Sequence, residues 1–239
     1  MKPQRKAIRD DSSPPWERPE PAARAAPSPL SRNRIIAAAI GIADRDGLSA
    51  VSLRSVGAAL DAGAMRLYGY LSTKEELLDL MIDAAYGEIV ADGPLRGDWR
   101  KVLRTVARRT RQVCQAHPWL VDLLGGRPHM GPNALAHYEA CLHALSKAPG
   151  FERIDTSVAA LRALNAYVIG AIRYERAEAG YRNSKADWQK IWWPYLQRQI
   201  ATGRFPMLAK VVRDATHPAP EEVFSEGLET VLDGLAAGL

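Results

Sequence analysis

The chain has 239 residues, 47% hydrophobic and 25% charged, a composition typical of globular proteins rather than of fibrous or wholly disordered ones. Its 32 Lys and Arg residues exceed its 27 Asp and Glu residues, so the formal net charge is +5. No apolar run approaches the roughly 18–20 residues of a membrane span, and the charged start at Met1–Lys6 has no apolar stretch behind it, which argues against a transmembrane protein and a secretory signal.

Residues 1–30 are predicted to form a disordered, mildly basic, proline-rich arm. They hold six basic residues, four acidic residues and seven of the chain's 16 prolines. Proline interrupts helices and sheets, and the segment has too little apolar surface to offset its loss of conformational entropy on ordering. The arm is either an inert tail or a segment that follows the DNA backbone, where each phosphate contact would steepen the salt dependence of binding.

From Ser31 onward the apolar residues are spaced as in helices and no run alternates as strands do. We therefore expect an all-α chain of about nine or ten helices. Ser31 is a good N-cap for the first helix, and Gly47 is the residue type expected just after its end. Ser52 can cap a second helix that runs to Leu60.

A third, short helix is predicted over 64–71, after a tight turn at Asp61–Gly63. Leu67 and Leu71 are spaced to face inward, so Arg66, Gly69 and Tyr70 should point outward or along the rim. Two short helices joined by a tight turn are what a helix-turn-helix needs, and its second helix must protrude to enter the major groove. The periodicity is equally compatible with an ordinary helical hairpin.

A long helix should follow, begun by a capping box of Ser72 and Glu75. We place a helix-turn-helix domain at 31–79 and a larger helical domain at 80–239. The net charge of 31–80 is zero, so the case for DNA binding rests on the pattern of residues and not on basicity.

The run Leu67-Tyr68-x-Tyr70-Leu71-x-x-Lys74-x-x-Leu77-Leu78, preceded by Ser52-Leu53-Arg54-x-Val56, resembles the DNA-binding domain of TetR-family transcriptional repressors. Three later segments are similar to the tetracycline-repressor type of C-terminal domain: His117-Pro118-Trp119, Gly126-Arg127-Pro128 and Gly131-Pro132-Asn133-Ala134-Leu135. The resemblance implies a cytoplasmic repressor that binds a palindromic operator as a dimer and is released by a small-molecule effector.

The resemblance also implies which residues contact DNA. Those expected on backbone phosphates are Arg54, Tyr68, Tyr70 and Lys74. Those expected at base edges are Ala64, Met65 and Arg66, with Gly69 on the same short helix. An arginine can donate two hydrogen bonds to guanine, which gives about 1–3 kcal/mol of discrimination. Lys74 stands in the first turn of its helix, where the helix dipole disfavours a cation, so a phosphate partner would explain its position. The alternative for Lys74 is a solvated side chain. The alternative for Tyr68 is packing in the core.

Two positions depart from the family pattern. Asp61 stands where the family usually has a glycine in the turn, and aspartate tolerates the left-handed conformation better than most residues, with Gly63 available to share the distortion. Leu123 stands where the tetracycline repressor has a histidine that coordinates magnesium. Because leucine cannot ligate a metal, a tetracycline–magnesium complex is not the expected effector, and no cofactor is expected.

Twelve of the 17 aromatic residues lie after residue 110. As a group they favour an aromatic effector pocket, whereas for any single one of them packing in the core is the better interpretation. Pro194 is expected to kink the helix that carries three of the tryptophans. The candidate pocket residues are Trp119, Tyr138, Asn165, Tyr167, Tyr174, Trp188, Trp192 and Trp193.

A dimer interface is implied on two later helices, which could otherwise be buried within one chain. Pairing them with the same helices of a second subunit would form a four-helix bundle. The candidate interface residues are Ala163, Ala166, Gly170, Phe224, Leu228, Val231, Leu232 and Leu235.

The sequence also bears on other classes of function. Cys114-x-x-His117 and His137-x-x-x-Cys141 could supply a Cys2His2 metal or redox site, and two cysteines are too few for a disulfide framework, which favours a reducing cytoplasm. The chain has no nucleophile elbow, no phosphate-binding glycine loop and no HExxH helix, so an enzyme is not expected. A helical adaptor that binds no DNA remains a further alternative.

Overall fold

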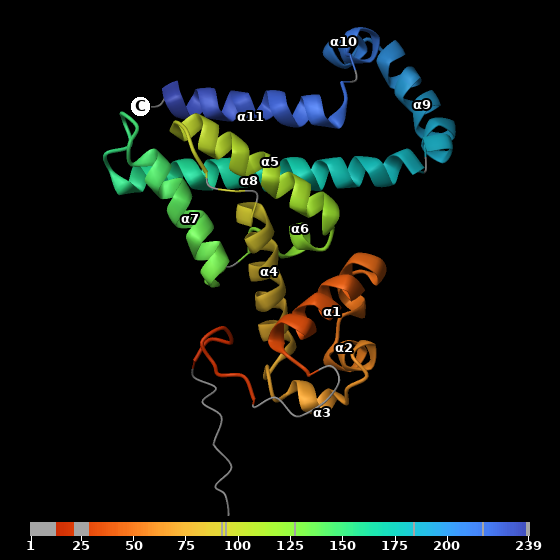
Figure 1. The fold of residues 1–239 in the computed structure, drawn as a ribbon. Coiled ribbons are helices and arrows are strands. Elements are labelled where there is room, and N and C mark those ends of the chain that lie inside the picture. Colours follow the sequence, from red (N-terminus) through yellow and green to blue (C-terminus); the bar gives the residue numbers. More distant parts are fainter. Residues whose placement is uncertain are drawn as a thin grey trace, which may run out of the picture. The chain divides into compact units, whose positions relative to one another are not determined.

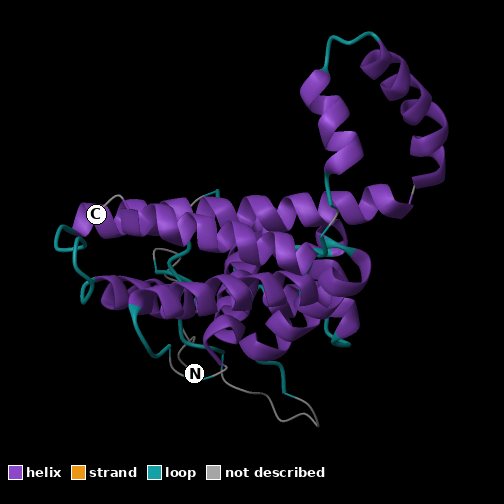
Figure 2. Cartoon of the chain, turned by 90° about the horizontal axis from the view of Figure 1, so that it is seen from above, coloured by secondary structure: helices purple, strands orange, loops and turns teal. Residues whose placement is uncertain are grey.

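The computed structural model describes residues 13–21, 29–91, 93, 95–126, 128–183, 185–216 and 218–237. Within these ranges the chain is all-α, with eleven α-helices, one short 3-10 helix and no strand (Figure 1 and Figure 2). The number exceeds the expected nine or ten because the four-residue α6 and nine-residue α10 are too short to show a clear period. The chain divides into two compact units, residues 1–158 and 159–239, which we describe separately. No described helix combines the length and the apolarity needed to cross a membrane.

Local capping residues set the first two helices as predicted. In α1 (Arg32–Asp46) the Ser31 hydroxyl accepts a hydrogen bond from the Arg34 N–H, and Gly47 ends the helix with φ +82°. Helix α2 (Leu53–Ala59) starts with a reciprocal capping box between Ser52 and Ser55. A single 3-10 turn, η1 (Leu48–Ala50), connects them. These bonds satisfy backbone donors that a helix start otherwise leaves unpaired.

The turn before the third helix is built as the departure at Asp61 predicted. Asp61 has φ +49°, the left-handed conformation, whereas Gly63 has an ordinary φ of −61° and does not share the distortion. The close approach of α2 to this turn depends on Gly57, since a Cβ there would lie 2.6 Å from the carbonyl oxygen of Ala62. The turn holds α2 and α3 together as a helix-turn-helix.

Helix α3 is shorter than predicted and spans only Ala64–Leu67. Beyond it the N–H of Gly69 donates to the Arg66 carbonyl and that of Tyr70 to the Leu67 carbonyl, so the chain tightens into turns in place of a continuing α-helix. The buried Tyr70 hydroxyl donates to the Leu30 carbonyl oxygen at 2.7 Å. A long-range hydrogen bond that the local period cannot show therefore holds the Tyr70 side chain inward.

Helix α4 (Lys74–Ala91) begins one residue later than the predicted capping box implies. Thr73, and not Ser72, accepts the hydrogen bond from the N–H of Glu76, at 3.1 Å. Glu76 then accepts from the N–H of Ser72 at 2.6 Å, so the acid of the box is Glu76 in place of Glu75. The shift places Lys74 at the first helical position.

Helix α4 is the central rod of the first unit. It packs against α1, α5 (Trp99–Ala116) and α7 (Pro132–Leu145) through a row of buried side chains, and α6 (Leu120–Leu123) also contacts it. The joint with α7 is polar. Asp83 is buried, and its carboxylate accepts hydrogen bonds from the N–H groups of Asn133 at 2.9 Å and Ala134 at 3.0 Å. The carboxylate thus caps α7 from a neighbouring helix.

Part of the N-terminal arm is ordered, contrary to the prediction for residues 1–30. Residues 13–21, which we call the N-terminal strap, lie along the start of α4, and Pro15 and Arg18 are buried. The physical reason is a set of polar contacts to the folded domain that composition alone could not show. The rest of the predicted arm, 1–12 and 22–28, lies outside the described residues.

The second unit contains most of α8 (Ile154–Asn183), α9 (Lys185–Ala201), α10 (Pro206–Asp214) and α11 (Pro220–Ala237). The Tyr167 hydroxyl on α8 donates to the Phe224 carbonyl oxygen on α11 at 2.7 Å, and the two rings pack at 5.8 Å between centroids. Helix α9 continues through Pro194, so the proline does not end the helix. The kink expected at Pro194 stays a prediction.

Candidate functional site

The short helix α3 is anchored on one side and exposed on the other. Leu67 is fully buried, while the Met65 side chain is 81% exposed and Arg66 is exposed beside it. Tyr68 is 44% exposed, which disfavours a mainly core-packing role for it. A helix held by a single leucine, with its remaining long side chains in solvent, has the shape that insertion into a groove requires.

The neighbouring basic side chains lie on the same domain. Arg54, on α2, is exposed, and Lys74, at the start of α4, is half-buried. Among the described residues no carboxylate forms an ion pair with Arg54, Arg66 or Lys74. These three cations are therefore not neutralised within the described part of the domain, and a polyanion could be their partner.

Tyr70 does not belong to this surface, and its predicted outward direction is wrong. Its side chain is 8% exposed and its hydroxyl is used by the Leu30 carbonyl, so it ties the start of α1 to the α3–α4 turn. Gly69 is half-buried and has a structural requirement, because a Cβ there would lie 2.9 Å from the Arg66 carbonyl oxygen. Ala64 is half-buried at the start of α3.

A second polar joint connects the helix-turn-helix to the rest of the first unit. His117 bridges two helices: its Nδ1 is 2.8 Å from Oδ1 of Asp44 on α1, and its Nε2 is 3.1 Å from Oε2 of Glu88 on α4. The Trp119 indole N–H donates to the same Asp44 oxygen at 2.7 Å. Trp119 is buried here, and its place in an effector pocket stays a prediction. We call Asp44, Glu88, His117 and Trp119 the α1–α4 joint.

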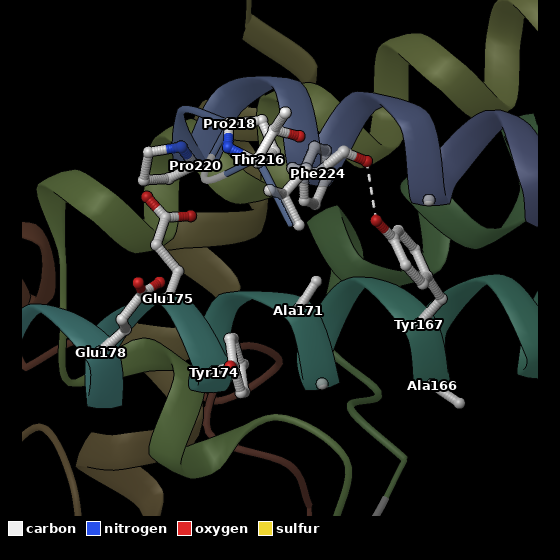
Figure 3. A pocket seen from close by; sticks show the side chains of 13 residues that line it. Ala166, Tyr167, Ala171, Tyr174, Glu175, Glu178, Thr216, Pro218, Pro220 and Phe224 are labelled. Carbon is white, nitrogen blue, oxygen red and sulfur yellow. Dashed lines mark hydrogen bonds between the residues drawn. The ribbon is translucent and has the colours of Figure 1, made fainter. Parts of the chain in front are cut away.

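The second unit contains a cavity of about 610 Å³ between α8, the 216–220 segment and the start of α11 (Figure 3). Two predicted residues, Tyr167 and Tyr174, line it, and Phe224 adds a third ring. Figure 3 shows Glu175 pointing toward Pro218 and Pro220, so the aromatic cavity has acidic groups at one end. The aromatic composition indicated the tyrosines, but Glu175 and the 216–220 segment join the cavity only through folding.

The other predicted pocket residues do not line this cavity. Tyr138 lies on α7 in the first unit and is largely exposed, and Asn165 is exposed on α8. Trp192 and Trp193 are exposed on α9, where the Trp192 ring packs edge-on against Tyr195. The side chain of Trp188 lies outside the described residues. Aromatic composition predicted a pocket but could not separate its lining from surface aromatics.

The predicted dimer residues on α8 and on α11 differ in their exposure. Ala163, Ala166 and Gly170 are exposed along α8. On α11 the three residues Phe224, Leu228 and Leu232 are buried within the chain itself, so their predicted place at an interface is wrong, and Val231 and Leu235 are half-buried. The i, i+4 spacing identified the apolar stripe of α11 correctly but not the partner that covers it.

Comparisons with known proteins decide the family. Residues 93–239 match the family described as tetracyclin repressor-like, C-terminal domain. A repressor of Streptomyces coeruleorubidus, the HTH-type transcriptional repressor DrrR1, is 34% identical over 225 residues, which cover 92% of this chain and 82% of that protein. The chain belongs to the TetR family of transcriptional regulators.

Other similar proteins agree with this assignment. An HTH-type transcriptional regulator of Saccharopolyspora erythraea is 39% identical over 180 residues, which cover 72% of this chain and 74% of that protein. The apo crystal structure of ActR from Streptomyces coelicolor superposes with a TM-score of 0.75 at 28% identity, covering 89% of this chain and 98% of that one. ActR has also been solved in complex with actinorhodin, with a TM-score of 0.75 at 27% identity over 90% of this chain and 98% of that one.

The alternative metal site of this TetR-family chain is not formed. No group of three or more His, Cys, Asp or Glu residues among the described positions could hold a metal ion. His117 is engaged in the α1–α4 joint, whereas Cys114, His137 and Cys141 are buried elsewhere in the unit. Burial raises the pKa of both thiols to about 12 and lowers the pKa of His137 to about 4, so all three groups are neutral near pH 7.

The α1–α4 joint predicts a pH dependence of stability. Burial lowers the pKa of His117, but the hydrogen bonds and charges of Asp44 and Glu88 outweigh it and raise the pKa above 6.5. The folded state therefore holds this proton more tightly than the unfolded state, so the stabilisation is complete below about pH 6.5 and is lost as the pH rises through the folded-state pKa. Thermal unfolding between about pH 6.5 and 8 should show Tm falling with pH in the wild type.

A His117→Gln variant provides the control for this slope. Glutamine carries no proton in the window, so its Tm should depend less on pH than that of the wild type. His137, whose pKa is lowered to about 4, is neutral in the folded state throughout this window and titrates below it. Equal slopes for wild type and variant would show that His117 does not hold its proton in the joint.

Proposed function

We propose that this TetR-family chain is a dimeric repressor that binds a palindromic DNA operator through α2 and α3 and releases it when a small-molecule effector binds. The observation that carries the proposal is the exposed α3, with Met65 and Arg66 in solvent and Leu67 as its anchor. Family membership supports DNA binding and makes catalysis and a helical adaptor poor alternatives.

The proposed DNA contacts divide into two kinds. Arg66 donates to a guanine edge, with Met65 and Ala64 against neighbouring bases. Arg54, Tyr68 and Lys74 contact phosphates on either side of the groove, which fixes orientation without carrying sequence information. Tyr70 is not among them, because its hydroxyl is already used within the domain.

A dimer is proposed because one α3 contacts too few bases. Two copies of α3 about 34–36 Å apart would lie in successive major grooves and give a palindromic site. The exposed small residues Ala163, Ala166 and Gly170 on α8 allow a second α8 to approach closely. The half-buried Val231 and Leu235 of α11 are proposed to extend this contact.

The experiment that tests this function is selection of bound DNA from a random duplex pool with the full chain. An inverted repeat with half-site centres about 10–10.5 base pairs apart is expected, because the symmetry of the protein is copied into its site. Enrichment of a single asymmetric half-site would contradict the dimer, and no enrichment at all would contradict the proposed function.

The effector is proposed to be a planar aromatic molecule that binds in the α8–α11 cavity. Tyr167, Tyr174 and Phe224 supply ring faces, and a cavity of about 610 Å³ falls in the range of small-molecule sites. Since Ala166 and Gly170 line the cavity and also belong to the proposed dimer face, a second subunit would close it further.

Actinorhodin is the first probe for this cavity, because ActR has been solved with it. It is expected to release operator DNA from the wild type. Tyr174→Ala should raise the concentration needed by about tenfold, the effect of losing one ring contact of about 1.4 kcal/mol. Tyr138→Ala, an exposed tyrosine outside the cavity, is the matched control. Release that is unchanged in Tyr174→Ala would place the effector elsewhere.

A further inference from the structure

The N-terminal strap is fastened to the helix-turn-helix domain at its middle. The Arg18 side chain is only 8% exposed and forms an ion pair with Glu76 on the first turn of α4. Its Nη1 donates to the Ser72 hydroxyl at 3.1 Å, and its Nε donates back to the Ser13 carbonyl at 2.9 Å. One guanidinium therefore joins the strap to the α3–α4 turn and to the start of α4.

The strap makes further contacts from Arg18 to its C-terminal end at Pro21. The Arg18 carbonyl accepts from Nη2 of Arg32, the first residue of α1, at 2.9 Å, and Glu20 accepts from the Arg32 N–H at 3.3 Å. Pro21 lies against the α3–α4 turn, since a Cβ on Gly69 would be 3.4 Å from its ring. The strap thus connects the starts of α1 and α4 with the turn that follows α3.

Trp16 extends the strap along α4. It lines a small cavity with Asp79 and Asp83 of α4 and with the 128–131 segment that leads into α7. Asp83 caps α7, so the strap reaches the α4–α7 joint as well as the helix-turn-helix domain. These contacts hold the strap in a defined place, unlike a tail that only follows the protein surface.

The charge of Glu76 gives the ion pair a consequence for DNA binding. Glu76 stands two residues after Lys74 in the first turn of α4, so its carboxylate adds a negative charge to the helix end that carries a proposed phosphate contact. Less compensation of that charge would increase its repulsion of a phosphate backbone. Arg18 supplies a compensating positive charge through its ion pair with Glu76 and at the same time holds the turn before Lys74.

We infer that the strap is a working part of the DNA-binding surface and that Arg18 is a positioning residue for operator binding. Arg18 offsets part of the Glu76 charge and fixes the start of α4, so that Lys74 can contact a phosphate. The inference rests on the proposed function, since it requires that the chain binds an operator. Arg18 itself contacts no DNA in this arrangement, because its side chain is buried between the strap and the start of α4.

The test measures operator affinity as a function of salt for the full chain and five variants. Arg18→Ala should weaken binding by about tenfold and lower the slope of log K against log salt by about one for each subunit, as the loss of one phosphate contact does. Lys74→Ala should do the same. The double variant Arg18→Ala/Lys74→Ala should be little weaker than either single variant, because both remove the same contact.

The Glu76→Gln variant tests the charge of Glu76 separately from its hydrogen bond to the Ser72 N–H. Glutamine can still accept from the Ser72 N–H but carries no charge, so Arg18→Ala/Glu76→Gln should recover most of the lost affinity. Glu76→Gln alone should bind at least as well as the wild type. The Tm of each variant shows whether it is folded, and if Arg18→Ala is not, Arg18→Gln replaces it.

The outcomes separate this inference from the proposed function. If the wild type binds no operator, the proposed function fails. If the wild type binds and Arg18→Ala binds equally well, or loses Tm with an unchanged salt slope, the strap is only structural and the inference is overturned. Additive losses in the Arg18 and Lys74 double variant would show that Arg18 acts independently of Lys74, which also overturns it.

Discussion

Replacing Arg66 with alanine is expected to weaken binding to the preferred operator by about tenfold or more and to abolish the preference at one base pair of each half-site. Arg66 is exposed on α3 with no acidic partner among the described residues, so its donors are available for a base. A bidentate arginine–guanine contact gives about 1–3 kcal/mol of discrimination, and a dimer makes the contact twice. Competition between the operator and single-base variants measures the change.

Lys74→Ala is the matched control for this prediction. Losing a phosphate contact should weaken binding to all sequences by a similar factor, with the base preferences intact and the salt slope reduced. The two variants should therefore differ in kind and not only in size. If Arg66→Ala kept every base preference of the wild type, Arg66 would not be the base contact, and Met65 would become the next candidate.

Replacing Gly131 with alanine is expected to destabilise the first unit strongly. A Cβ at this position would lie 2.2 Å from Oδ1 of Asp83, well inside van der Waals contact. The clash falls on the buried carboxylate that caps α7, so either the cap or the approach of α4 to α7 is lost. The cost should be about 3 kcal/mol or more, from overpacking combined with unsatisfied buried polar groups.

Gly126→Ala is the control for the Gly131 variant. Nothing lies within 4 Å of a Cβ at Gly126, so its free energy of unfolding should change by no more than about 0.5 kcal/mol. Asp83→Ala should destabilise by a similar mechanism without the clash, because the donors of Asn133 and Ala134 lose their acceptor. Urea unfolding curves of the three variants measure these differences, and a stable Gly131→Ala protein would refute the account of the α4–α7 joint.

Short-range features of the fold were predictable from the sequence. Ser31, Ser52 and Gly47 act within a few residues of themselves, so their residue types were enough to place the ends of α1 and α2. Asp61 adopts the left-handed conformation for the same local reason. The exposed position of Met65 and Arg66 followed from helical spacing together with the resemblance to TetR-family proteins.

Features that depend on distant partners were not predictable. Tyr70 is buried because its hydroxyl meets a carbonyl 40 positions earlier, and Trp119 because its indole meets Asp44, 75 positions earlier. The strap is ordered through Arg18 and Glu76, two residues that composition assigns to solvent. Spacing on α11 identified an apolar stripe, but one chain's sequence does not reveal whether the same chain or a second subunit covers it.

The most direct test of the account is to map where α3 lies on bound DNA. Met65→Cys, at an exposed position of α3, can carry an iron chelate, and both native cysteines are buried and so react slowly with the label. Hydroxyl-radical cleavage should occur at two symmetric places about 10–10.5 base pairs apart in the major groove, whereas a chelate at His143→Cys, exposed on α7, should cleave little. Absence of cleavage from position 65, or cleavage at one place only, would contradict a paired α3 in the major groove.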